Sequence, residues 1–98
     1  MANDNAFYAQ EASRDYGTSL NLVANHIINE VVRAKGKHPR DFSSPHEAHS
    51  VIEEEFDEFW DEVKAQKHDH NGMRTELIQT AAMCVRALVE LNLVHAAD

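Results

Sequence analysis

Carboxylates crowd residues 53–62 of this chain in an arrangement that could hold a divalent cation. Glu55, Glu58 and Glu62 are spaced three and four residues apart, so on a helix they lie along one face. Like charges stacked in this way destabilise a helix by about 0.2 to 0.5 kcal/mol per pair. Mg²⁺ prefers carboxylate oxygens, and its binding would remove this repulsion. The acidic face is therefore a candidate metal site, and the alternative is a solvated surface that aids solubility.

A further carboxylate comes from the next predicted helix, which is expected over about residues 73–94. Residues 67–72 before it are polar and end in the turn pair Asn-Gly, so the two helices are expected to form an antiparallel hairpin. Glu76 lies near the start of the later helix. In such a hairpin it approaches the later part of the earlier helix, near Glu58 and Glu62.

The acidic helix has a clear start signal. Residues 37–43, which include a proline and show no periodicity, form a connector before it. Ser44 suits the N-cap, Pro45 suits the first helical position, and Glu47 completes a capping box. The helix is expected to continue to about Gln66, with one apolar side made of Val51, Ile52, Phe56, Phe59, Trp60 and Val63.

An earlier amphipathic helix is predicted to begin at Thr18. Apolar residues recur at steps of three and four from Leu20 to Val32. Thr18 suits the N-cap, and Gly36 is expected to end the helix in the left-handed conformation. Residues 1–17 before it are expected to form an arm or a short helix.

These elements predict an all-α fold, a small antiparallel bundle of three main helices in one domain over residues 18–98. With 98 residues the core is marginal, so a homo-oligomer, either a dimer or a tetramer, is expected to complete the bundle. Seven residues of the last helix are expected to face inward: Leu77, Ile78, Ala81, Cys84, Val85, Leu88 and Leu91.

The charge balance narrows the classes of partner. A net charge of -8, with 17 acidic and 9 basic residues, argues against a protein that binds nucleic acid by neutralising phosphates. The lone cysteine, Cys84, falls among apolar residues and implies a buried thiol in a reducing compartment. Apolar runs are too short to span a membrane, so we expect a cytoplasmic protein with no membrane partner.

The acidic stretch also resembles a known family signature. Residues 54–63 resemble the first motif of the MazG-like all-α nucleoside triphosphate pyrophosphohydrolases, a Glu-x-x-Glu pattern followed by another acidic residue. Glu55 and Glu58 match the two glutamates, and Asp61 matches the acidic position. The likeness is greatest to the compact, often phage-borne members of that family.

A second motif of the same family, Glu-x-x-Asp on the next helix, resembles residues 75–83. Glu76 matches its glutamate, but Gln79 stands where the family has aspartate. Together with the helix start at residue 44, the resemblance covers roughly residues 43–91. It implies the family's all-α fold.

The resemblance implies Mg²⁺-dependent hydrolysis, with Mn²⁺ as a substitute, of a nucleoside triphosphate to a monophosphate and pyrophosphate. The implied metal ligands are Glu55, Glu58 and Glu76, and Gln79 could add a carbonyl oxygen but no charge. The implied catalytic set is Glu55 and Glu58 together with Asp61 or Glu62 as weaker ligands or water-positioning groups. Because Gln79 departs from the motif, two alternatives stay open: a non-catalytic relative that binds nucleotide or metal, and a helical protein-interaction module.

Cations and an aromatic near the acidic site could bind the nucleotide. Lys64, Arg74 and Arg86 could bind the triphosphate, although each also suits a solvent-facing helix position. Trp60 could stack on a base, although its position also suits packing. The seven histidines complete no zinc-binding pattern and are interpreted as structural or surface residues.

Overall fold

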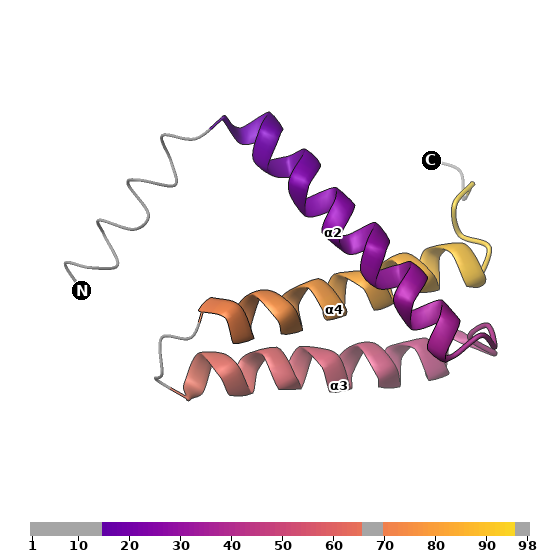
Figure 1. The fold of residues 1–98 in the computed structure, drawn as a ribbon. Coiled ribbons are helices and arrows are strands. Elements are labelled where there is room, and N and C mark those ends of the chain that lie inside the picture. Colours follow the sequence, from indigo (N-terminus) through magenta and orange to yellow (C-terminus); the bar gives the residue numbers. More distant parts are fainter. Residues whose placement is uncertain (1–14, 66–69, 96–98) are drawn as a thin grey trace.

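The computed structural model describes residues 15–65 and 70–95, which form three α-helices (Figure 1). Helix α2 is Tyr16–Lys37, α3 is Pro45–Lys64 and α4 is His70–Glu90, and the described residues include no strand. The all-α prediction is confirmed. Most of the arm expected over residues 1–17 lies outside the described residues, as do residues 66–69 of the expected turn.

Helix α2 is capped differently from the prediction. Asp15 is its N-cap, and its carboxylate accepts hydrogen bonds from the Gly17 amide at 3.1 Å and the Thr18 hydroxyl at 2.7 Å. Thr18 is thus a donor to the cap and not the cap itself. The predicted end was also wrong, because Gly36 remains helical and α2 continues to Lys37.

Helix α3 begins where the sequence predicts. The Ser44 hydroxyl accepts the Glu47 amide at 3.1 Å, and Pro45 is the first helical residue. The Glu47 carboxylate returns to the Ser43 amide at 2.8 Å instead of the N-cap amide, and it also pairs with Arg40 at 2.7 Å. Hydrogen bonds from Arg40 and from the Ser43 amide lower the pKa of Glu47 to about 2.

Both ends of α4 differ from the prediction. The helix begins at His70, so Asn71 and Gly72 lie in its first turn and not in the loop. It ends at Glu90, four residues early, because Asn92 adopts a left-handed conformation with a φ of 61°. The Leu93 amide then bonds the Leu88 carbonyl at 2.8 Å, which is a Schellman-type end.

Helices α3 and α4 run antiparallel side by side, and α2 crosses α4 at an angle (Figure 1). Small residues lie where the helices meet: Ala34 of α2 packs with Ala82 and Met83 of α4. The predicted inward face of α4 was partly wrong, because Leu77, Leu88 and Cys84 are exposed in the single chain. The buried residues of α4 are instead Ala82, Met83, Arg86 and Ala87. The Cys84 thiol is therefore not buried as expected.

Many large apolar side chains remain uncovered. No large side chain among the described residues is fully buried, and α2 alone exposes Leu20, Leu22, Val23, Ile28 and Val32. The first half of α2 projects away from the hairpin (Figure 1). One chain therefore leaves an extensive apolar surface on this helix.

A buried ion pair fixes the connector between α2 and α3. Arg86 and Glu90 of α4 have side chains only 5% and 6% exposed and are joined at 2.7 Å. Arg86 also donates to the carbonyls of His38 and Arg40, each at 3.2 Å, and Glu90 accepts the Phe42 amide at 2.8 Å. Burial alone would raise the pKa of Glu90, but these hydrogen bonds from Arg86 and Phe42 hold it below its ordinary value.

Glu90→Ala is expected to destabilise the fold by about 3 kcal/mol, because it leaves the Arg86 charge buried without its carboxylate. Urea unfolding followed by circular dichroism measures the change. Glu53, whose side chain is 64% exposed, supplies the control, and Glu53→Ala should change stability by less than about 0.5 kcal/mol. A loss below about 1 kcal/mol for Glu90→Ala would show that the connector does not depend on this pair.

Candidate metal centre

Three carboxylates from two helices converge in the hairpin. Glu55 and Glu58 of α3 and Glu76 of α4 each place a carboxylate oxygen within 4.8 Å of the other two. Spacing of three residues puts the first two on one face of α3, and the antiparallel packing brings the start of α4 against that face. The structure thus brings together the three carboxylates among the predicted metal ligands.

Gln79, the fourth predicted ligand, lies one turn after Glu76. Its side-chain amide is satisfied when the nitrogen faces the carboxylates, 3.3 Å from Glu55 Oε2 and 3.1 Å from Glu76 Oε2. In this orientation the amide donates to both carboxylates and bridges α3 and α4. Its carbonyl oxygen, which was expected to face a metal, then faces away.

The cluster carries negative charge that its neighbours do not neutralise. Among the described residues, no Lys or Arg forms an ion pair with any of the three carboxylates. Burial raises the pKa of Glu55, and the charge of Glu58 raises it further. Burial also raises the pKa of Glu76, together with a hydrogen bond to Glu58 and the nearby charges.

Oxygen ligands with excess negative charge fit a hard cation such as Mg²⁺. Two oxygens on opposite sides of Mg²⁺ lie about 4.2 Å apart, since each bond is about 2.1 Å long. Only one pair among three ligands can be opposite, and neighbouring ligands lie about 3 Å apart, so oxygens up to 4.8 Å apart would have to draw together by roughly 1 to 2 Å. The donor set suits such an ion by its chemistry.

The two remaining predicted catalytic carboxylates lie differently. Glu62 is close enough to Glu76 for its charge to contribute to the raised pKa of that residue. Asp61 is 72% exposed and pairs with Lys64 at 3.6 Å. Glu62 therefore lies within electrostatic range of Glu76 but is not one of the three converging carboxylates, and Asp61 lies in solvent.

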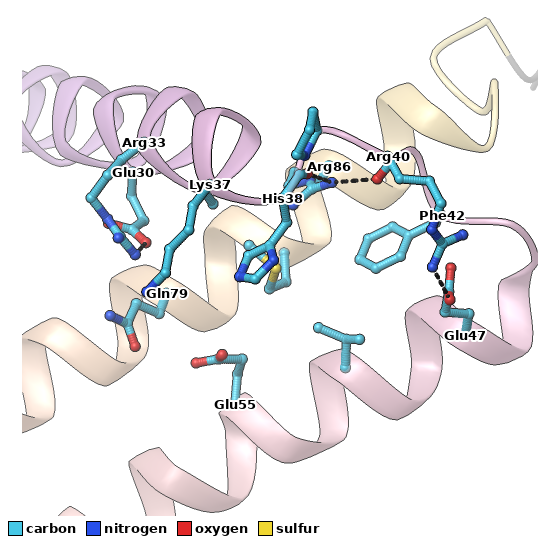
Figure 2. A pocket seen from close by; sticks show the side chains of 14 residues that line it. Glu30, Arg33, Lys37, His38, Arg40, Phe42, Glu47, Glu55, Gln79 and Arg86 are labelled. Carbon is cyan, nitrogen blue, oxygen red and sulfur yellow. Dashed lines mark hydrogen bonds and ion pairs between the residues drawn. The ribbon is translucent and has the colours of Figure 1, made fainter.

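A pocket of about 610 Å³ adjoins the cluster, between the end of α2, the connector and the hairpin. Glu55 and Gln79 belong to its lining, so the carboxylate cluster borders it (Figure 2). The lining also contains the cations Arg33 and Lys37 from α2 and Arg40 from the connector, and Glu30 and Glu47, the partners of the two arginines, lie beside them. A cavity with carboxylates on one side and cations on the other suits a metal-bound polyanion.

Sequence reasoning missed these three basic residues. Arg33 and Lys37 are four residues apart, so their shared helical face was readable from the sequence. The sequence did not show that this face meets the hairpin, because the crossing of α2 over α4 depends on tertiary packing. Lys35 and Gly36 were instead interpreted only as a helix end.

The predicted nucleotide-binding residues lie mostly outside this pocket. Lys64 and Trp60 pack together at 5.8 Å, and neither is in the pocket lining. Arg86 does line the pocket, but its donors hold Glu90 and the connector. Arg74 lies 3.2 Å from His26 and borders a separate cavity of about 270 Å³.

Comparison of the chain with protein-family models, curated proteins and solved structures gives no match. Within residues 15–65 and 70–95, no helix combines the length and the apolar character needed to cross a membrane. The site must therefore be interpreted from its own geometry and chemistry.

Glu76→Gln is expected to stabilise the metal-free protein at neutral pH. Because folding raises the pKa of Glu76 above 4.5, the folded state binds its proton more tightly, and stability falls as pH rises from the unfolded value through the folded one. Removing the charge should raise the free energy of unfolding by about 0.5 kcal/mol at pH 7 and change it little near pH 4.

Urea unfolding in EDTA at the two pH values measures this difference. Glu53→Gln serves as the control and should show no gain at either pH, since its side chain is 64% exposed. An equal gain for Glu76→Gln at pH 7 and pH 4 would contradict the repulsion argument.

Proposed function

We propose that this chain is a metal-dependent nucleoside triphosphate pyrophosphohydrolase of the MazG-like kind. The observation that carries the proposal is the convergence of Glu55, Glu58 and Glu76 within 4.8 Å, beside a pocket whose lining includes cationic side chains. The resemblance of residues 54–63 and 75–83 to the two family motifs supports the same reaction. A pocket of about 610 Å³ is also within the usual range for small-molecule sites.

The chemistry divides between the ion and the chain. When bound, Mg²⁺ would neutralise the triphosphate and polarise the phosphoryl group under attack. Glu55, Glu58 and Glu76 would hold the ion at the edge of the pocket. Glu62, which lies within electrostatic range of Glu76, is the remaining carboxylate that would orient a water molecule and accept its proton.

The bond changes follow from that arrangement. The water oxygen bonds to the α-phosphorus, and the bond from this phosphorus to the oxygen bridging to the β-phosphorus breaks. Pyrophosphate leaves with the electron pair of that bond, and the nucleoside monophosphate keeps the new oxygen. Asp61, exposed and paired with Lys64, is better suited to a supporting charge than to proton transfer.

Incubation with a panel of NTPs and dNTPs plus Mg²⁺ or Mn²⁺ is expected to release pyrophosphate. Glu58→Gln should lower kcat at least 100-fold, about 3 kcal/mol, since it removes a charge that holds the ion. Glu55→Gln should act in the same way, and Glu53→Gln, on the same helix but outside the cluster, should retain activity.

Circular dichroism must show that each variant is folded as the wild type is. Metal-dependent turnover that survives in both Glu55→Gln and Glu58→Gln would exclude this site. Turnover that persists in EDTA would exclude the metal-dependent reaction.

The position of Gln79 favours a second candidate function. Its amide donates to Glu55 and Glu76, so the cluster has one charge fewer than the family motif would supply. A relative of this kind could bind nucleotide or metal without catalysis. Calorimetry would then show nucleotide-dependent heat without product, and a protein-interaction module would show no rise in melting temperature with Mg²⁺ or Mn²⁺.

We propose further that a second copy of the chain covers the apolar surface of α2. The buried core residues are few, and several large apolar residues of α2 are more than half exposed, such as Leu22 at 56% and Ile28 at 57%. Burying apolar area is worth about 25 cal/mol per Å², so covering this surface would add stability that a marginal core lacks.

Size-exclusion chromatography with light scattering should therefore give at least twice the chain mass of 11.1 kDa. Ile28→Glu should reduce the mass towards that of one chain, because the charge would be buried in the interface. His49→Glu, at a position with a side chain 75% exposed on α3, should leave the mass unchanged. A stable monomer at micromolar concentrations would contradict the proposed interface.

A further inference from the structure

Four cationic side chains line the pocket beside the carboxylate cluster, and three of them are already paired. Arg33 binds Glu30 through two hydrogen bonds, of 2.9 and 2.6 Å. Arg40 forms an ion pair with Glu47 at 2.7 Å, and Arg86 forms one with Glu90, also at 2.7 Å. Each of these cations would have to share or leave its partner to bind an anion.

Lys37 is the exception. Within the described residues it forms no ion pair, although it lines the same pocket as Glu55 and Gln79. Figure 2 shows its side chain extending from the end of α2 towards Gln79, the residue that bonds to Glu55. An unpaired ammonium group therefore reaches towards the acidic cluster.

The direction of α2 makes this side chain necessary for binding an anion at that wall. Lys37 is the last residue of the helix, so the pocket meets the carbonyl end of α2, which carries partial negative charge. Backbone amides at a helix start often bind phosphate, but this end presents none. A positive side chain must supply the attraction, and lysine does so as a point charge.

From this arrangement we infer that Lys37 binds the phosphate chain of the nucleotide in this pocket. The inference rests on the proposed function and assigns a residue that neither motif contains. Glu55, Glu58 and Glu76 would hold the ion that binds the phosphates near the cleaved bond, and the Lys37 ammonium group would contact a neighbouring phosphate. Paired arginines keep the remaining wall close to neutral, so Lys37 supplies the uncompensated charge.

Steady-state kinetics with the NTP that gives the highest turnover test this assignment. Lys37→Ala should raise KM about tenfold and change kcat less than threefold, because it removes a binding contact and not a metal ligand. Lys37→Arg should restore KM to within about threefold of the wild type, since the charge returns. KM of the wild type should also rise with salt more steeply than KM of Lys37→Ala.

Lys64→Ala is the matched control, because Lys64 is an exposed helix-end lysine that the structure leaves out of the pocket. Its KM should equal that of the wild type. Equal KM values for Lys37→Ala and the wild type, or an equal rise for Lys64→Ala, would overturn the assignment and leave the proposed reaction intact.

If the wild type hydrolyses no nucleotide, the proposed reaction fails and the binding assignment is tested separately. Calorimetry with inorganic tripolyphosphate, in the presence of Mg²⁺, should then show binding to the wild type and to Lys64→Ala that weakens about tenfold in Lys37→Ala. Absence of binding to the wild type, or equal affinity in all three proteins, would overturn the assignment.

Discussion

The buried pair between Arg86 and Glu90 determines how the chain passes from α2 to α3. Arg86 binds two connector carbonyls and Glu90 binds the Phe42 amide, so this side-chain pair provides hydrogen-bond partners for backbone groups that lie outside the helices. This holds the connector against α4 and closes one end of the pocket. The connector residues Arg40 and Phe42 therefore line the same pocket as Glu55.

Close helix crossing and apolar exposure are linked in this molecule. Ala34 and Ala82 allow α2 to approach α4 closely, but small side chains bury little area per contact. The large apolar residues, such as Ile28 and Leu88, are left on the outside of the single chain. The same choice of residues that allows the close crossing therefore leaves apolar surface exposed on the hairpin and on α2.

Local signals predicted part of this structure, and tertiary contacts decided the rest. The start of α3 at Ser44 and Pro45 was predicted correctly because capping depends on neighbouring residues alone. Helical spacing and a hairpin placed Glu76 near Glu58 and Glu62, whereas the set of Glu55, Glu58 and Glu76 was implied by the family resemblance. The buried face of α4 and the pocket position of Lys37 were missed because both depend on where α2 crosses, which no periodicity encodes. The end of α4 was missed because Asn92, not glycine, takes the left-handed conformation.

The Gln79 amide also affects how many groups of the cluster can bind and release a proton. Carboxylates must lose their protons before they bind a cation, so cation uptake is coupled to proton release. An amide does not titrate, so Gln79 contributes no proton to that release. Three carboxylates, and not four, would have to be ionised before the cluster binds a cation, so the dependence of cation binding on acid pH should be shallower than four carboxylates would give.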